Sequence, residues 1–398
     1  MEISSDYAFN AETDMDFING ITISKKDLVI NGNNHIIDGS HQGKILKLFD
    51  VGITINNLTF INSNGSAIWS NYSDIITSNL VFKDNFASEG AAVCGYNTDY
   101  SSNNDKFINN YAEKGAAIYL QENSALNLNN GTFSSDKELY YGLLYLKESN
   151  LGVLNTNFVN LTSIYSPAFF GNDVNYTFKN CKFINLFANM TGGAIAVTSL
   201  MEYVNVVENC SFINVSSTRN GGAIYFEMLS SYSGAGLFVS NSQFTNCSSG
   251  FGGAILNLGG ELKIQHSNFT NNLAKYQGGA IYSNITFITN IFYSNFVNNT
   301  LMNLSSELNK GTAVYGFSIS DGFRIRYCNF TDNMADYASA VFAEISFYSI
   351  LDSYFKGNGQ DIYTTFDKPS SISKNNTFAD GTQKYHQKTM SGLLKAIT

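Results

Sequence analysis

Hydrophobic and polar residues alternate along this chain in short runs that recur about every 25 residues. GITINNLTF at 52–60 places Ile53, Ile55, Leu58 and Phe60 on a two-residue spacing that slips once by one residue and then resumes. LGVLNTNF, ELKIQHSNF and GFRIRYCNF repeat this spacing further along. Because a strand alternates with a period of two, each run predicts two short strands separated by a bend or bulge.

Alignment on the phenylalanine gives twelve repeat units and a thirteenth, degenerate one. Five of the spacings between successive markers are 25, and the long ones equal 25 plus an insertion. Such a period without helical patterning predicts a β-solenoid, and parallel crossovers are overwhelmingly right-handed. We therefore predict an all-β fold, a single right-handed parallel β-helix of about 13 coils in which Phe stacks on Phe. The markers are Phe60, Phe82, Phe107, Phe133, Phe158, Phe183, Phe212, Phe244, Phe269, Phe296, Phe330, Phe355 and Phe378.

Three further positions recur relative to the marker. The second residue after it is Asn or Asp in ten of the twelve full units, which predicts a left-handed corner and a ladder of stacked amides. The second residue before it is small or polar in most units. A Gly-Gly-Ala-Ile element follows at 191–197, 220–226, 251–257 and 278–284. Its glycines permit an unusual φ or close contact between coils, and its Ile begins the next inward strand.

The outer surface carries the candidate binding features. The residue after each marker is β-branched in most units and is expected to face outward, with apolar area added by Tyr225, Phe226, Phe238, Tyr282 and Phe292. Solenoids concentrate binding in excursions of single repeats. The insertions around MLSSYSGAG (228–236) and LMNLSSELN (301–309) are therefore the predicted specificity loops.

Composition fits a turn-rich β fold, and charge excludes some partners. There are 52 Asn and 33 Gly among 398 residues, and 44% of the residues are hydrophobic. A net charge of −9 with three Arg argues against nucleic acid, which needs a basic footprint. Five Cys without a CxxC pattern indicate neither a disulfide framework nor a zinc site.

Targeting segments are not evident in the sequence. No apolar run reaches 18 residues, so no membrane span is expected in this chain. The opening MEISSDYAFNAETDMDF lacks a basic n-region and an apolar h-region. If the protein is exported, we expect its signal and any anchor to lie outside this chain.

The residues resemble a known group of surface proteins. Gly-Gly-Ala-Ile paired with Phe-x-x-Asn resembles the repeat of the chlamydial polymorphic outer-membrane proteins. The stretch ITISKKDLVINGNNHIIDGS (21–40) followed by NLTFINSNGSAIW looks even more like the adhesin-like surface proteins of methanogenic archaea. The similarity covers nearly the whole chain. It implies a right-handed parallel β-helix, export and an anchor or translocator, and supplies no catalytic residues.

Parallel β-helices also include enzymes that cut acidic polysaccharides, and a few residues of this chain are candidates for such a site. Asn97-Thr98-Asp99 matches the first element of a polygalacturonase-like site, but no Asp-Asp pair and no Gly-His-Gly occurs. Asp99 and Asp105 could form the carboxylate pair of a glycosidase, although their Asn-rich surroundings favour solvated side chains. No clustered Asp or Glu suggests a calcium site, and no cofactor or metal is predicted.

Arginine and cysteine supply the remaining candidates. Arg324 and Arg326 alternate across Ile325, so both are expected to point outward, where they could bind an anionic sugar or serve a lyase. Solubilising charge on an exposed strand is the alternative. Cys181, Cys210 and Cys328 share the small position before the marker and are interpreted as buried thiols.

These observations favour a non-enzymatic, extracellular or cell-surface adhesin-like protein. It would present a rigid β-helix, repeats at 21–378, to a carbohydrate or a cell-surface protein. We predict that residues 1–20 cap the first coil and that 379–398 form an end coil or a junction to further sequence. The alternatives are a secreted polysaccharide lyase or glycoside hydrolase, with Asp99, Asp105, Arg324 and Arg326 as its site, and a structural cell-envelope spacer.

Overall fold

The computed structural model describes residues 1–24, 27–230, 234–302, 309–336, 338–365, 372–380 and 385–387. The chain divides into two compact units, unit 1 (1–187) and unit 2 (188–398), and each is described by itself. Apart from one short 3-10 helix, η1 (Met15–Phe17), the regular structure described is all β. No helix among the described residues has the length and hydropathy of a membrane span.

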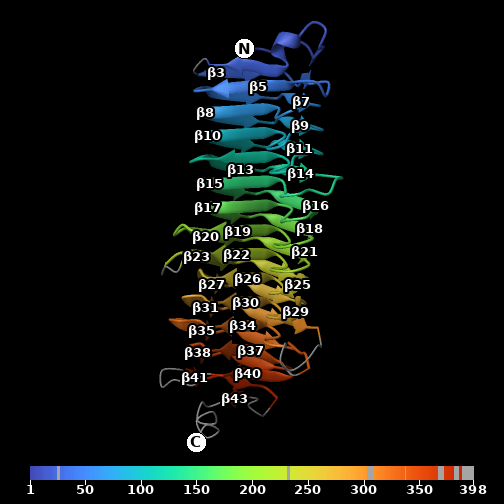
Figure 1. Ribbon diagram of the computed structural model, residues 1–398. Coiled ribbons are helices and arrows are strands. Elements are labelled where there is room, and N and C mark those ends of the chain that lie inside the picture. Colours follow the sequence, from blue (N-terminus) through green and yellow to red (C-terminus); the bar gives the residue numbers. More distant parts are fainter. Residues whose placement is uncertain are drawn as a thin grey trace, which may run out of the picture. The chain divides into compact units, whose positions relative to one another are not determined.

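Each coil contributes up to three strands. We call them the glycine strand, which follows the Gly-Gly-Ala element, the middle strand, and the phenylalanine strand, which contains the marker. Equivalent strands of successive coils pair in parallel, as the labelled arrows of Figure 1 show within each unit. The predicted right-handed parallel β-helix with a period near 25 residues is confirmed.

In unit 1 the glycine and middle strands merge into single long strands in several coils. The glycine strands are β2 (Asn19–Ile23), β5 (Lys44–Phe49) and β12 (Ile118–Gln121), and the middle strands are β3 (Leu28–Asn31), β6 (Gly52–Asn56) and β13 (Ala125–Asn129). The merged strands are β8 (Ile68–Ser78), β10 (Val93–Asn103), β15 (Leu144–Leu154) and β17 (Phe169–Lys179). The phenylalanine strands are β4 (Ile36–Asp38), β7 (Thr59–Ile61), β9 (Val81–Lys83), β11 (Lys106–Ile108), β14 (Thr132–Ser134), β16 (Asn157–Ser163) and β18 (Lys182–Ala188).

In unit 2 the glycine and middle strands remain separate. The glycine strands are β19 (Ile195–Ser199), β22 (Ile224–Met228), β26 (Ile255–Leu258), β30 (Ile281–Asn284), β34 (Val314–Phe317), β37 (Ser339–Glu344), β40 (Gln360–Thr364) and β43 (Tyr385–Gln387). The middle strands are β20 (Val204–Glu208), β23 (Gly236–Ser240), β27 (Glu261–Gln265), β31 (Ile288–Phe292), β35 (Gly322–Arg326), β38 (Tyr348–Leu351) and β41 (Ile372–Lys374).

The phenylalanine strands of unit 2 are short. They are β21 (Ser211–Ser217), β24 (Gln243–Thr245), β28 (Asn268–Thr270), β32 (Asn295–Val297), β36 (Asn329–Thr331), β39 (Tyr354–Lys356) and β42 (Thr377–Phe378). Three further short strands follow some of them, β25 (Ser248–Phe251), β29 (Leu273–Gln277) and β33 (Thr300–Leu301).

The chain makes about 14 turns, one more than the thirteen markers. The additional turn precedes Phe60, and its Ile37 pairs with Phe60 in register, so Ile occupies the marker position there. Part of the segment before β2 contacts this first turn, and the cap predicted at residues 1–20 stays a prediction. Strand β1 (Tyr7–Ala8) pairs with β4, and the amino group of Met1 donates a hydrogen bond of 2.7 Å to the Val29 carbonyl.

The C-terminal end coil that the sequence predicts at 379–398 falls mostly outside the described residues. Of this segment the structure describes only Ala379, Asp380 and 385–387. The prediction for this end therefore stays a prediction.

The marker phenylalanines form the centre of the core. In unit 1 the rings from Phe60 to Phe183 stack with neighbouring centroids 4.7 to 5.4 Å apart, and in unit 2 those from Phe212 to Phe378 stack at 4.7 to 5.3 Å. Nearly all of these rings are fully buried. Burial of one such side chain contributes roughly 2 kcal/mol, so the predicted Phe-on-Phe stack is a major part of the core.

The bends between strands are single left-handed residues. All ten Asn or Asp residues at the second position after the marker have φ between 50 and 56°, as predicted. A second column of such corners lies three residues before the marker, and all thirteen of its members have φ between 50 and 57°. Exposed amides bond along both columns, for example Asn298 to Asn271 at 2.8 Å and Asn130 to Asn104 at 2.7 Å.

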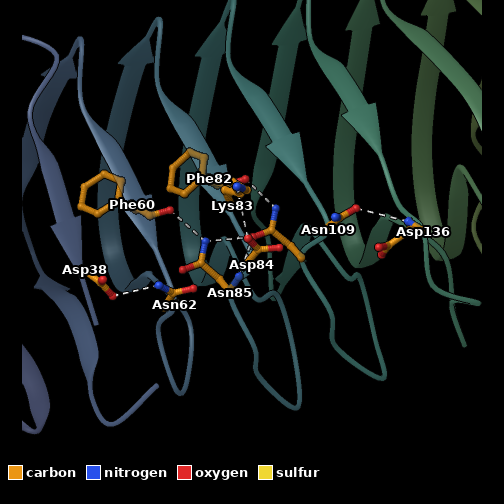
Figure 2. Close-up of polar contacts among 10 residues, drawn as sticks. Asp38, Phe60, Asn62, Phe82, Lys83, Asp84, Asn85, Asn109 and Asp136 are labelled. Atoms are coloured by element: carbon orange, nitrogen blue, oxygen red, sulfur yellow. Dashed lines mark hydrogen bonds and ion pairs between the residues drawn. The ribbon is translucent and has the colours of Figure 1, made fainter. Parts of the chain in front are cut away.

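The Asn of Phe-x-x-Asn has a different place from the corner Asn beside it. Its side chain turns inward and is buried, as Asn85 illustrates in Figure 2, whereas the corner residue Asn62 is half-buried and donates to Asp38 at 3.0 Å. The Asn85 amide donates to the Phe60 carbonyl at 3.1 Å and to the Asn110 side chain at 2.9 Å. An equivalent ladder of buried amides in unit 2 joins Asn272, Asn299, Asn333 and Asn358. It satisfies backbone groups that the turn would otherwise leave buried and unpaired.

The two glycines of Gly-Gly-Ala-Ile have different roles. The first has φ of 61 to 64° in all four elements, a backbone that side chains rarely adopt. The second lies against the next coil, and a Cβ on Gly253 would be 1.9 Å from the Gly279 carbonyl oxygen. The unusual φ predicted from the sequence therefore occurs at the first glycine, and the close contact between coils occurs at the second.

The second glycine provides a direct test of this close approach. We expect Gly253→Ala to lower the free energy of unfolding by about 3 kcal/mol, because the added methyl group must push two backbones apart. Gly359→Ala is the matched control, since its Cβ would be 3.7 Å from the nearest atom. Urea unfolding of both variants measures the difference, and equal stability of the two would contradict the proposed role.

The buried amide ladder predicts a second effect. Asn299→Ala removes acceptors and donors used by Asn272, Asn333 and the Phe269 carbonyl. We expect a loss of about 3 kcal/mol in the free energy of unfolding, because buried polar groups lose their partners. Asn298→Gly, one residue away at the exposed corner, should cost less than about 1 kcal/mol. A larger effect of the exposed change would show that the buried ladder is not the stabilising one.

Candidate ligand-binding surface

The two candidate carboxylates of unit 1 do not share a face. Asp99 is exposed on the outer face of β10, next to Asp74 of the preceding coil in the strand register. Asp105 is fully buried at the small position before Phe107. The expectation of solvated side chains is correct for Asp99 and wrong for Asp105, because that position belongs to the inward column.

Asp105 is held by a buried polar cluster. One carboxylate oxygen accepts from the hydroxyls of Thr77 and Ser102, the latter at 2.6 Å, and the other accepts from the Leu80 amide at 2.7 Å. Burial raises the pKa of Asp105 above its ordinary value of 3.8, against the opposing effect of these hydrogen bonds. Tyr100 is also buried in this cluster, with its hydroxyl oxygen 3.0 Å from that of Thr77. The cluster is enclosed, so it is a feature of the core.

Asn97-Thr98-Asp99 has a structural explanation at each residue. Asn97 is a left-handed corner with φ of 46°, and Thr98 is buried with its hydroxyl 3.0 Å from that of Ser70. Asn97 is half-exposed and bonds to Glu122, and Asp99 is exposed on the outer face. The three side chains therefore do not converge on one point.

All five cysteines are buried free thiols, which agrees with the interpretation of Cys181, Cys210 and Cys328 from the sequence. Burial raises the pKa of Cys94, Cys247 and Cys328 to about 12. A thiol with such a pKa is protonated near neutral pH and is a poor nucleophile.

Arg324 and Arg326 lie side by side on the outer face of β35, with Ile325 buried between them. The Arg324 guanidinium donates to the Asp321 carbonyl at 3.1 Å and lies 4.0 Å from its carboxylate. Gly322 leaves room for it, since a Cβ there would be 2.8 Å from the guanidinium. The Arg326 Nε is buried and has no hydrogen-bond partner in the described part of the chain. The outward orientation predicted from the sequence is confirmed.

A hollow opens beside these arginines. Its volume is about 360 Å³, and it is lined by Arg324, Asp321, Phe347, Tyr348 and neighbouring small residues. In the strand register Arg324 follows Lys263 and Asn290, and Arg326 follows Gln265 and Phe292. Positive charge, amide groups and one aromatic ring thus share this outer face of unit 2.

Three exposed rings border the same face. His266, Tyr293 and Tyr327 stack with centroids 5.0 and 4.9 Å apart, and Tyr293 and Tyr327 are about half exposed (50% and 49%). Each directly follows the last residue of a middle strand, so Tyr327 adjoins Arg326. We call Lys263, Arg324, Arg326, Phe292 and the three stacked rings the arginine surface.

The backbone under these rings is unusual for their size. They occupy the corner column three residues before the marker, where nine of the thirteen residues are Asn, and their φ values are 50 to 55°. A Tyr in the left-handed region costs roughly 1 to 2 kcal/mol, which exceeds or equals the ~1 kcal/mol of an aromatic stack. Sequence analysis missed this set, although a column of Asn interrupted by His, Tyr and Tyr could have revealed it.

The other predicted outer features are mostly in place. The residues after the markers are half-buried or exposed, and Tyr225, Phe238, Tyr282 and Phe292 face outward. The prediction that Phe226 faces outward is wrong, because its side chain points into the core and is fully buried.

The predicted specificity loops fall partly outside the described residues, at 231–233 and 303–308. Leu301 and Lys310, described residues near the ends of the second loop, line a hollow of about 890 Å³. There Lys310 pairs with Glu344 at 2.7 Å and lies over the Tyr315 and Phe342 rings. No group of three His, Cys, Asp or Glu within the described ranges could hold a metal ion.

Comparison with known proteins identifies the repeat. The sequence profile of the Chlamydia polymorphic membrane protein repeat matches residues 266–284. The chain therefore carries a repeat of the polymorphic-membrane-protein type. The matched segment holds His266, Phe269 and one Gly-Gly-Ala-Ile element, while the resemblance to archaeal adhesin-like proteins stays a prediction. No curated protein sequence matches this chain significantly.

Among solved structures, the chain is similar to crystal structures of the periplasmic alginate epimerase AlgG. For one the identity is 8% and the TM-score 0.43, over 96% of this chain and 84% of that one. For an aspartate-to-alanine mutant of AlgG the identity is 9% and the TM-score 0.40, over 96% of this chain and 84% of that one. For a double mutant the identity is 8% and the TM-score 0.39, over 97% of this chain and 84% of that one. We draw no functional conclusion from similarity at this distance.

Asp105 predicts a pH dependence of stability. Because its pKa is raised in the folded state, the folded chain keeps a proton that the unfolded chain has lost, and stability falls as pH rises from 3.8 through the raised value. The side chain of Asp105→Asn cannot ionise. We therefore expect the free energy of unfolding of this variant to rise relative to that of the parent as pH increases through this window. At pH values above the window the difference should stay at its higher level. Urea unfolding at several pH values measures this, with Asp99→Asn as control. Parallel pH profiles of parent and Asp105→Asn would contradict it.

Proposed function

We propose that the protein is a non-enzymatic, adhesin-like surface protein, and that its arginine surface binds a carboxylated glycan. The observation that carries this proposal is the stack of exposed rings at His266, Tyr293 and Tyr327 beside Arg326. Bulky side chains held in a costly backbone conformation are found most often at functional sites. Stability alone would favour Asn at these corners, as in most other coils.

The chemistry of the arginine surface fits a sugar acid. A guanidinium binds carboxylate oxygens with two parallel hydrogen bonds, and the Arg324 and Arg326 side chains are both half-exposed on this face. Exposed tyrosines add apolar area and hydroxyl groups that can pack against and hydrogen-bond a sugar ring. The chain is acidic overall, with two of its three arginines on this one strand. Lys263 pairs with Glu261 at 2.9 Å, and Arg324 lies 4.0 Å from the Asp321 carboxylate. Arg326 is therefore the cation of this surface that has no ion pair with a described residue and can attract a uronate.

A binding role accounts for the candidates better than catalysis. A glycosidase needs two carboxylates on either side of one bond, whereas Asp99 and Asp105 lie on opposite sides of the coil wall in unit 1. The match to a membrane-protein repeat supports placement at a cell surface or outside the cell. Carbohydrate is the partner that the arginine surface favours over a cell-surface protein, and no feature favours nucleic acid.

The corner tyrosines separate function from stability. We expect Tyr327→Asn to keep or raise the free energy of unfolding by about 1 kcal/mol, because Asn adopts the left-handed backbone readily. The same variant should bind hexagalacturonate at least tenfold more weakly than the parent, measured by calorimetry. Arg326→Gln should weaken binding similarly and reduce its dependence on salt.

Lys356→Gln is the control, since it removes a positive charge from a phenylalanine strand of the same unit. Absence of binding to any uronate hexamer, or unchanged affinity of both variants, would overturn the proposal. Mass spectrometry of the same mixtures, with and without calcium, tests the enzymatic alternative. Any released shorter oligosaccharide would contradict the non-enzymatic assignment.

A further inference from the structure

Unit 1 has a second outer surface of different chemistry on its middle strands. Three outward columns run across β10, β13, β15 and β17, and they are rich in amides. In register, Ser101 pairs with Asn127, Asn127 with Gly152, and Gly152 with Thr177. Asn150 and Asn175 occupy the column beside it, and Asn103 and Asn129 the third.

Two adjoining hollows lie on this face. Their volumes are about 200 and 180 Å³, and both are lined by Asn127 and Gly152. Gly152 creates the depression because it has no side chain in a column that otherwise carries polar ones. Together the two hollows form a shallow groove that crosses successive coils, which we call the amide groove.

The amides of the groove are available to a ligand. The side chains of Asn103, Asn127, Asn150 and Asn175 make no hydrogen bond to any described residue. The corner amides a few residues away do bond to one another, as Asn180 does to Asn155 at 3.1 Å. These four amides are therefore not used in the ladder that stabilises the coils, whereas Asn129, which also lines the groove, accepts a hydrogen bond from Asn155 at 3.0 Å.

The charge of the groove selects the class of ligand. None of the residues lining the two hollows is charged. Two outward charges of opposite sign flank these residues in the register, Asp99 beside Ala125 and Lys179 beside Leu154. The groove therefore has no net charge that would favour an ionic ligand over a neutral one. Each amide offers two donors and an acceptor, which matches the hydroxyls of a neutral sugar, and the exposed Leu154 adds an apolar contact.

We infer that the amide groove binds an uncharged oligosaccharide that lies across successive coils of unit 1. This site is separate from the arginine surface in residues and in ligand charge, and it does not depend on the function proposed for that surface. An uncharged chain gains hydrogen bonds from several coils at once, since equivalent positions recur at the strand spacing of about 4.8 Å.

Gly152→Val tests the inference by filling the groove. The position is an ordinary strand conformation facing outward, and an added Cβ would meet only the tip of the flexible Asn127 side chain, at 3.1 Å. Valine favours strands, so we expect an unchanged or higher Tm. Calorimetry would use cellohexaose, mannohexaose, chitohexaose and maltohexaose as neutral probes and hexagalacturonate as the charged comparison.

We expect at least one neutral hexamer to bind the parent and to bind Gly152→Val at least tenfold more weakly. Thr54→Val, an outward change on β6 outside the groove, should keep the parent's affinity. Tyr327→Asn should do the same, which separates this site from the arginine surface. Binding of no neutral hexamer, equal affinity of Gly152→Val and the parent, or loss of neutral binding in Tyr327→Asn would each overturn the inference.

Discussion

The structure depends on the parallel register that places each residue of a coil over its equivalent in the next. In both units this register aligns Phe with Phe. In unit 2 it also aligns Asn with Asn and brings the glycines of successive coils together. The approach of successive Gly-Gly-Ala elements is so close that a single methyl group does not fit at Gly253. A shift of the register by one residue would place core side chains in solvent, so each of these columns supports the others.

Because equivalent residues stack, the coil wall sorts them by chemistry. Apolar rings and the amides of Phe-x-x-Asn face inward, where the amides satisfy turn carbonyls. The left-handed corners are filled mainly by Asn, the residue best suited to that backbone. What remains is an outer face on which substitutions cost little, and different stretches can therefore carry different chemistry without disturbing the fold.

The two outer surfaces illustrate this freedom. The arginine surface of unit 2 combines guanidinium groups with rings on strained corners, and the amide groove of unit 1 combines unpaired amides with the space left by one glycine. Neither contains a pair of converging carboxylates within the described residues. Both surfaces present rows of groups at the coil spacing, which suits extended ligands with a repeating structure.

The sequence by itself determined the repeat, the parallel β-helix, the Phe stack, the left-handed corners and the outward direction of Arg324 and Arg326. These follow from local periodicity and from the few residue types that a corner accepts. Only the tertiary structure decided that Asp105 is buried while Asp99 is exposed. Asp105 occupies the same position before the marker as the buried cysteines, but a carboxylate is held there only because Thr77 of the preceding coil and Ser102 donate hydrogen bonds to it. The same holds for Phe226, whose alternation within its own strand outweighed its apparent place on the surface. The amide groove was likewise invisible, since its residues are brought together by pairing between coils about 25 residues apart. Spacing along the chain predicts which residues share a column. Which side chains of a column lack hydrogen-bond partners depends on the neighbouring columns, and only the tertiary structure shows those.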